Sequence, residues 1–263
     1  MKKLLTICLT LCLILGLAAC GSSSSNNETP AANPLDEALL TSGKIIVGTS
    51  PDYPPFESLN AAGEVEGFEV DLLNGVMEVL NQQNGTSYTV ELKQMDFSTI
   101  ISALQANQID VGMSGFTYSP DRDCIFATPH LVSKQVIVTR EDTGINGPED
   151  LVGKKVAAGT GTTGAEALAE VIGEENVLYP GDYTVMYQSL AAGQLDAVVS
   201  DEAVGDNYVK EFGLKKCETP LVNEEMSFII KTGNTVLADA FNKALEEFMK
   251  TDAYKALLDK YGL

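Results

Sequence analysis

The sequence predicts an α/β protein built from two similar lobes, and three observations support this prediction. The chain has 263 residues, enough for two lobes that each bury a core. Short apolar runs alternate with segments whose apolar residues recur at helical spacing, which is typical of βαβ units and a largely parallel sheet. The residue pattern of 104–114 also returns at 190–200.

The first predicted strand covers residues 44–48 and closes on a glycine. Residues 50–56 follow as a stiff loop, because a segment with three prolines cannot lie in a central strand. The next elements are a helix over 68–80, a strand over 88–92, a helix over 97–104 with Asp96 or Ser98 as N-cap, and a strand over 111–113. The chain is predicted to end in one long amphipathic helix from Leu237 to Tyr261.

The two repeated segments carry Leu, Ala, Gln, Asp and Ser at corresponding positions. Each copy predicts a helix, a tight turn with an aspartate, and a strand that ends in Ser114 or Ser200. In open α/β sheets, ligands bind beyond the carboxyl ends of the strands. The loops after these strands are therefore the candidate binding site.

The N-terminal residues resemble the signal of a bacterial lipoprotein. Lys2 and Lys3 precede an apolar run over 4–19, which is short for a membrane span, and small residues then precede Cys20. We expect residues 1–19 to be a signal peptide, Cys20 to carry lipid, and residues 20–43 to be a flexible tether outside the cytoplasmic membrane. An ordinary signal peptide with an incidental Cys20 is the alternative.

The composition excludes several classes of function. The formal net charge of −20 disfavours nucleic-acid binding, which needs clustered Lys and Arg. Beyond the leader and Cys20, only Cys124 and Cys217 remain, so no disulfide framework and no zinc-ligand pattern is present. Whether these two cysteines pair is left open by the sequence.

The loop over 114–122 carries groups suited to a carboxylate. Gly115 lets the backbone approach a ligand closely, Thr117 offers a hydroxyl, and Arg122 offers a planar fork of five donors. A solvated arginine is the alternative. Residues 159–166 form a Gly/Thr loop at the start of a helix, where free N–H groups suit a single anion, but the loop lacks the motifs of phosphate and dinucleotide sites.

Asp201 directly follows an apolar strand, so its carboxylate can pair with an ammonium group or cap the next helix. An arginine, hydroxyls, helix-start amides and an aspartate together complement a zwitterion. Tyr53 and Phe97 are candidates to stack on the side chain of such a ligand, and a position in the core is the alternative for each.

Nearly all of the chain after the tether resembles the polar amino acid-binding proteins of ABC importers, solute-binding family 3. The matching segments follow one another in order: Gly48–Glu57, Gly67–Leu72, Asp96-Phe97, Ile109–Arg122, Gly161–Thr163 and Leu195–Glu202.

The resemblance implies a two-lobe periplasmic-binding-protein fold (type II), in which each lobe has a central β-sheet flanked by helices. Two crossover strands, near Ser133 and near 224–226, would join the lobes. Lobe 1 would cover residues 44–133 and lobe 2 residues 134–223, and residues 224–263 would return to lobe 1 and form the C-terminal helix.

The resemblance also implies roles for the candidate residues. The ligand α-carboxylate would be held by Arg122, helped by Thr117 and by Thr162 or Thr163. Asp201 would take the α-ammonium group with help near Ser114 and Gly115, while Tyr53 and Phe97 would line the side-chain pocket. Ser50 stands where members that bind basic or amide side chains often carry an acid, and Gly115 replaces a frequent serine, so the side-chain specificity stays open.

The implied function is that of a monomeric, extracytoplasmic binding component of an amino acid ABC importer. It would bind a free polar or charged L-amino acid by lobe closure and deliver it to the permease, with no cofactor, metal or catalytic residue. Two alternatives remain: a sensor for a membrane receptor, and an enzyme similar to cyclohexadienyl dehydratase. The only histidine, His130, lies outside the matched binding loops and has no evident Ser or Cys partner.

Overall fold

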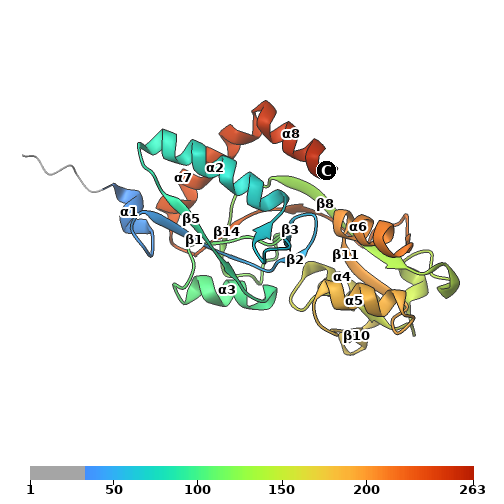
Figure 1. Ribbon diagram of the computed structural model, residues 1–263. Coiled ribbons are helices and arrows are strands. Elements are labelled where there is room, and N and C mark those ends of the chain that lie inside the picture. Colours follow the sequence, from blue (N-terminus) through green and yellow to red (C-terminus); the bar gives the residue numbers. More distant parts are fainter. Residues whose placement is uncertain (1–32) are drawn as a thin grey trace, which may run out of the picture. The chain divides into compact units, whose positions relative to one another are not determined.

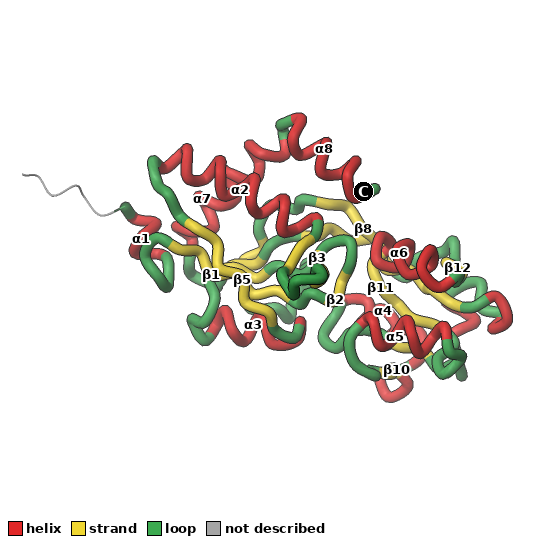
Figure 2. The backbone as a smooth tube through the Cα atoms, viewed as in Figure 1, coloured by secondary structure: helices red, strands yellow, loops and turns green. Residues whose placement is uncertain are grey.

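The computed structural model describes residues 33–263 of the chain. The expected signal peptide, the lipidation site Cys20 and most of the expected tether lie outside the described residues. Within 33–263 the chain forms two large β-sheets and a small third one, and helices cover both faces of each large sheet (Figures 1 and 2).

The helices are α1 (Pro34–Ala38), α2 (Phe68–Asn84), α3 (Phe97–Gln105), α4 (Thr163–Ile172), α5 (Tyr183–Ala191), α6 (Glu202–Phe212), α7 (Thr235–Met249) and α8 (Asp252–Tyr261). The strands are β1 (Lys44–Thr49), β2 (Asp52–Tyr53), β3 (Glu57–Leu59), β4 (Val65–Glu66), β5 (Thr89–Gln94), β6 (Val111–Gly112), β7 (Ile125–Phe126), β8 (Leu131–Thr139), β9 (Val156–Ala157), β10 (Val177–Leu178), β11 (Ala197–Asp201), β12 (Lys215–Lys216), β13 (Val222–Met226) and β14 (Ile229–Ile230).

The first large sheet has the strand order β5-β1-β6-β14-β7, and the second has β10-β9-β11-β8-β12 with β13 also paired to β8. The strands of the βαβ units, β5, β1 and β6 in one sheet and β10, β9 and β11 in the other, run parallel. The remaining strands run antiparallel to their neighbours. The prediction of a largely parallel sheet therefore holds for half of each sheet, and antiparallel strands complete both.

Two antiparallel strands connect the two sheets. The chain leaves the first sheet after β7 and enters the second through β8, and it returns through β13 to β14. β13 pairs over its whole length with the first half of β8, with Glu224 opposite Ser133 and Met226 opposite Leu131. The two connections thus lie side by side, as a hinge between lobes requires.

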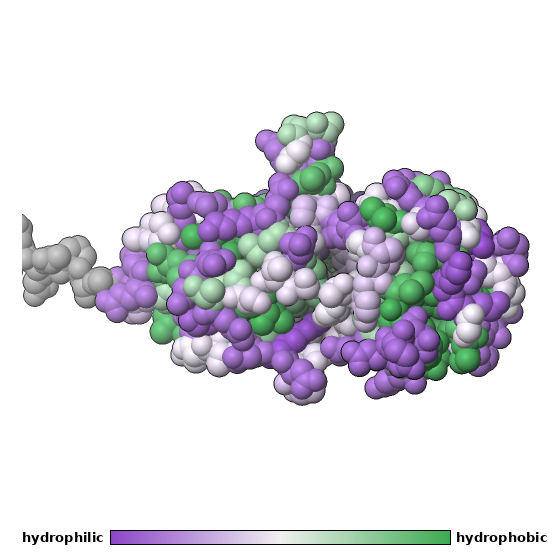
Figure 3. All heavy atoms as spheres, turned by 90° about the horizontal axis from the view of Figure 1, so that it is seen from below, coloured by the Kyte–Doolittle hydropathy of each residue, from purple (hydrophilic) through white to green (hydrophobic). Residues whose placement is uncertain are grey.

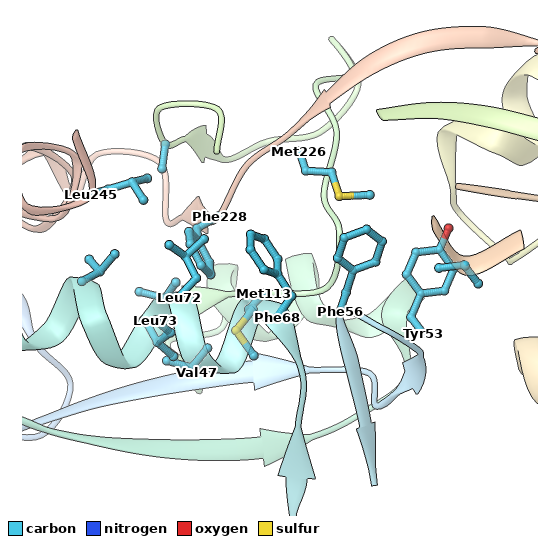
Figure 4. Packing of buried hydrophobic residues seen from close by; sticks show 14 of the residues in the cluster. Val47, Tyr53, Phe56, Phe68, Leu72, Leu73, Met113, Met226, Phe228 and Leu245 are labelled. Atoms are coloured by element: carbon cyan, nitrogen blue, oxygen red, sulfur yellow. The ribbon is translucent and has the colours of Figure 1, made fainter. Parts of the chain in front are cut away.

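The core of the first lobe forms because both faces of β1 are buried. Val47 packs under the apolar face of α2, where Leu72 and Leu73 meet Phe228 and α7 (Figure 4). On the opposite face of the sheet, Ile46 packs with apolar residues of α3. The sequence of a strand covered by helices on both sides is a nearly continuous run of apolar residues, as in residues 44–48.

The second lobe is built the same way around β11. Val199 packs with Leu168 of α4 on one face, and Val198 packs with residues of α5 and α6 on the other. Cys217 is buried in this lobe, whereas Cys124 packs in the first lobe, and both are free thiols. The pairing that the sequence left open is thus absent from the described chain.

The repeat detected in the sequence is a structural repeat. In each copy a helix, α3 or α5, ends in a turn with a left-handed residue, Asn107 or Gly193, and leads into β6 or β11. The aspartate of each copy then bonds to the chain of the neighbouring strand, β1 or β9: Asp110 accepts the Ile46 N–H at 2.8 Å, and Asp196 accepts the Lys155 N–H at 2.9 Å.

Two predicted boundaries were wrong. Residues 34–43, expected in the tether, include helix α1, and Leu35 is buried against the first lobe because its apolar side chain has a place in that core. The single C-terminal helix is two helices, since Thr251 caps α8 with a hydrogen bond from the Tyr254 N–H. This break lets α8 fold back against α2, where Lys260 pairs with Asp71 at 2.6 Å.

The face shown in Figure 3 mixes hydrophilic residues, drawn in purple, with smaller hydrophobic areas, drawn in green. None of the helices within residues 33–263 is both long and apolar enough to cross a membrane.

Packing between α2 and α7 yields a first prediction. A Cβ atom at Gly75 would lie 2.3 Å from the Phe248 ring, so Gly75→Ala forces the helices apart. Alanine is the better helix former by about 1 kcal/mol, but overpacking costs about 1–3 kcal/mol. We therefore expect Gly75→Ala to have a lower melting temperature than wild type in thermal unfolding. Asn74→Ala, at the exposed neighbouring position, serves as the control and should not be destabilised. A Gly75→Ala protein as stable as wild type would contradict this packing.

Candidate ligand-binding site

A cavity of about 330 Å³ lies between the two lobes, within the size range of small-molecule sites. Both large sheets contribute loops to its wall, as expected for ligands that bind beyond the ends of strands. The lining residues are Ser50, Asp52, Tyr53, Asp96, Phe97, Ser98, Ser114, Gly115, Arg122, Gln135, Gly159, Thr160, Thr162, Thr163, Tyr179, Gly181, Asp182, Tyr183, Met186 and Asp201.

All but one of the residues predicted from the sequence line this cavity. They are Tyr53, Phe97, Ser114, Gly115, Arg122, Thr162, Thr163 and Asp201. The exception is Thr117, which forms a bridge with Met226 and lines a groove beside the crossover strands instead. The carbonyl of Thr117 still takes part indirectly, because it accepts a hydrogen bond from Arg122.

Arg122 enters the cavity from the loop before β7. Its guanidinium lies 5.6 Å from the ring centre of Phe97 and 5.4 Å from that of Phe116, and these two rings stack on each other. It also donates to the carbonyl oxygen of Gly161 at 2.9 Å, across the cleft. Burial lowers the pKa of Arg122, but arginine's ordinary pKa is so high that the group stays charged.

The guanidinium forms no ion pair with a carboxylate anywhere in residues 33–263. Two of its donors are bonded to carbonyl oxygens, which carry no net charge. The positive charge of Arg122 therefore faces the cavity without a carboxylate in contact, although Glu166 and Glu224 act on it from farther away, and its other donors can bind an incoming carboxylate.

Asp201 ends β11 on the opposite side of the cavity and is buried. Its carboxylate accepts hydrogen bonds from Tyr53 Oη at 2.6 Å, Ser133 Oγ at 2.6 Å and Gln135 Nε2 at 2.9 Å. Burial, and then the nearby charge of Glu224, raise the pKa of Asp201 to about 7, although the hydrogen bonds act in the other direction. The alternative role for Asp201, as the cap of α6, is wrong, because its side chain makes no capping hydrogen bond.

Tyr53 joins the two lobes. It belongs to the small sheet of the first lobe, and its hydroxyl both donates to the Asp201 carboxylate and accepts from the Asp201 N–H at 2.9 Å. Its ring centre lies 4.6 Å from that of Tyr183 of the second lobe. The neighbouring Asp52 accepts the Tyr183 N–H at 3.1 Å, so two consecutive residues carry contacts across the cleft.

The hydroxyls of Thr162 and Thr163 have partners within the protein. Thr162 caps α4 by accepting from the Ala165 N–H at 3.1 Å and donates to the Gly159 carbonyl at 2.8 Å. Thr163 donates to Glu224 at 2.6 Å. Both residues thus shape the start of α4, whose first N–H groups meet the cavity at a place suited to an anion.

Sequence reasoning did not identify several lining residues. Gln135 follows Ser133 by two positions on β8, so strand alternation places both on the face toward Asp201, and this spacing was a usable signal. Tyr183 and Asp182 follow a Pro-Gly pair, which predicts only a turn. Their position in the cavity depends on how the second lobe meets the first.

The chain was then compared with known proteins. The family model for bacterial extracellular solute-binding proteins, family 3, matches residues 45–263. A probable histidine-binding protein of Neisseria gonorrhoeae is 30% identical over 99% of this chain and 96% of its own length.

Solved structures agree with the sequence comparison. An ancestral arginine-binding protein bound to arginine is 33% identical, with a TM-score of 0.76 over 83% of this chain and 98% of its own. An ancestral amino acid-binding protein described as a precursor of cyclohexadienyl dehydratase is 29% identical, with a TM-score of 0.74 over 83% and 99%. The predicted two-lobe fold of type II periplasmic binding proteins is confirmed, and the chain belongs to family 3 of the bacterial extracellular solute-binding proteins.

Proposed function

We propose that this protein binds a free L-amino acid with a cationic side chain and serves as the binding component of an ABC importer. The observation that carries this proposal is the placement of Arg122 and Asp201 at one cavity, each from a different lobe. Arg122 would hold the α-carboxylate and Asp201 the α-ammonium group, as charge-assisted hydrogen bonds favour.

The charges that remain favour a basic side chain. Once a zwitterion has neutralised Arg122 and Asp201, the lining still holds Asp52, Asp96 and Asp182, and Arg122 is the only basic side chain among the lining residues. Opposite charges attract more strongly in a partly dry site than in water, so a cationic group would gain there and an acidic one would be repelled.

Aromatic rings support the same ligand class. Phe97, Tyr53 and Tyr183 line the cavity, and a cation over an aromatic face gains from the ring's electrostatic field. The family relatives named above include a histidine-binding protein and an arginine-bound structure, which fit this class.

Binding would close the lobes. The contacts between Tyr53 and Asp201, between Asp52 and the Tyr183 N–H, and between Arg122 and Gly161 all cross the cleft and would hold a closed form. A ligand that needs both lobes shifts the open–closed equilibrium toward that form, and β8 and β13 would act as the hinge. A membrane permease would then recognise the closed protein.

We further propose that the protein acts as a monomer outside the cytoplasmic membrane, anchored through lipid on Cys20 after removal of residues 1–19. It would act without catalysis. His130 is buried and does not line the cavity. A dehydratase-like enzyme that used this cavity would therefore have no histidine in its active site. A sensor role would use the same cavity and differ only in the membrane partner.

Comparison of arginine with citrulline tests the side-chain class, because citrulline has nearly the same shape and no side-chain charge. We expect calorimetry to give at least about tenfold weaker binding for citrulline. Asp52→Asn should reduce the ratio of the citrulline Kd to the arginine Kd. Asp259→Asn, at an exposed position on α8, should leave this ratio unchanged. Equal affinities for both ligands would refute a cationic ligand, and failure of every amino acid to bind would refute the whole proposal.

Arg122→Ala tests the carboxylate contact. Loss of a buried partner charge typically costs about 2–5 kcal/mol, so affinity for arginine should fall at least about 30-fold. Arginine methyl ester lacks the carboxylate charge and provides the matched ligand, since its binding should be weak in wild type and change little in the variant. An Arg122→Ala protein that binds arginine normally would exclude this contact.

The pH dependence tests Asp201. Its carboxylate is neutral below its pKa of about 7 and binds an ammonium group well only when ionised, so affinity for arginine should rise about tenfold between pH 6 and pH 8. The stability of the unliganded protein should change in the opposite direction and fall as pH rises. A raised pKa means that the contribution of Asp201 to stability is present at low pH and is lost as pH rises through about 7. Asp201→Asn should flatten both profiles, and parallel profiles in wild type and variant would contradict the assignment.

A further inference from the structure

Two buried glutamates lie behind the cavity and do not line it. Glu57 begins β3 and Glu69 lies in the first turn of α2, and both side chains are fully buried. Their carboxyl groups meet at one loop: Ser114 Oγ donates to Glu57 Oε1 at 2.9 Å, and the Gly115 N–H donates to Glu69 Oε2 at 2.9 Å. Gly115 holds this loop in a left-handed conformation, with φ +59°. The two acids therefore fix the two residues that face the ligand's ammonium side of the cavity.

His130 extends this group toward the hinge. Its Nε2 lies 3.0 Å from Glu69 Oε1, and its ring packs between Phe68 and Phe228. The His130 N–H donates to the carbonyl of Met226 at 2.9 Å, and the Tyr254 hydroxyl donates to the His130 carbonyl. Because His130 immediately precedes β8 and Met226 ends β13, the group reaches both crossover strands.

A charge on Glu57 is disfavoured in this place. Burial, and then the charge of Glu69, raise the pKa of Glu57 well above its ordinary value, and Asp52 on β2 adds to this. The other groups that face Glu57 are the Ser114 hydroxyl and Glu69, and no lysine or arginine of residues 33–263 pairs with either acid. Glu57 Oε2 has no hydrogen-bond partner other than its acidic neighbour. A proton kept on Glu57 satisfies that oxygen, as in other paired carboxyls.

We propose that Glu57 keeps a proton and, together with Glu69 and His130, forms a buried unit that positions Ser114 and Gly115 for the ligand and ties this loop to the hinge. The three residues are positioning residues, since none of them lines the cavity. Loss of the Glu57 proton would place a second carboxylate beside Glu69 beneath the loop and weaken binding. This inference rests on the proposed amino acid-binding function.

The experiment measures arginine affinity by calorimetry from pH 6 to pH 9.5 in wild type and in Glu57→Gln. Glutamine keeps the size and the donor of the protonated acid and cannot ionise. We expect both proteins to bind equally at pH 6 and wild type to become weaker than the variant above it, toward about tenfold at the alkaline limit. Changes in the ligand's own charge cancel, because both proteins meet the same ligand at each pH. Glu66→Gln, at an exposed position on β4, is the matched control and should follow wild type.

A second measurement needs no ligand. A raised pKa at Glu57 gives wild type a contribution to stability that is lost as pH rises. The melting temperature of Glu57→Gln relative to that of wild type should therefore increase toward alkaline pH. Glu57→Ala leaves Ser114 and Glu69 without their partner and should bind arginine more weakly at every pH. Should that variant fail to fold, the pH profiles of Glu57→Gln still test the proposal.

Parallel pH profiles of affinity and stability in wild type and Glu57→Gln would overturn the proposed proton on Glu57 while leaving the binding function intact. Failure of wild type to bind any amino acid, with the stability difference still present, would overturn the binding function and leave the proton on Glu57 supported.

Discussion

The carboxylate of Asp201 lies in the interior where the two lobes meet, and an ionised acid in such a place is costly unless donors or a cation surround it. Its donors come from separate parts of the chain: Tyr53 from the small sheet of the first lobe, and Ser133 and Gln135 from a crossover strand. This set is complete only when the lobes have approached each other. Under the proposed function, this one buried acid makes lobe closure, hinge position and ligand recognition depend on one another, because a ligand ammonium group would supply the cation that the site lacks.

The positive charge of Arg122, across the cavity, is positioned in a different way. Arg122 is fixed by the stacked rings of Phe97 and Phe116 and by two carbonyl oxygens, none of which neutralises it. A carboxylate in that place would have stabilised the empty protein and removed the charge that a ligand needs. The two lobes therefore offer separate groups of opposite charge, which a zwitterion would bridge under the proposed function.

The sequence predicted most of its candidate residues at the cavity because they occupy places that local patterns indicate. Arg122 and Asp201 follow apolar strands within a repeated unit, and loops after strands are where α/β proteins bind ligands. Thr117 was placed in the site because it shares this loop, but its side chain turns toward the groove by the crossover strands. Asp182 and Tyr183 could not be predicted, since only the approach of the second lobe brings them to the cavity. The break at Thr251 was missed because apolar spacing continues across it, whereas a threonine cap is a local signal that the spacing hides.

Asp201 and Glu57 show how equal burial can lead to different chemistry. Both acids are removed from water, which raises the pKa of each. Asp201 receives three hydrogen bonds from neutral donors, so its surroundings are prepared for a negative charge and a small further gain from a cation suffices to ionise it. Glu57 receives one, from Ser114, and faces a second carboxyl group, so its surroundings resist a charge. The neighbours, rather than the depth of burial, thus decide which acid is suited to bind a cation and which is suited to keep a proton.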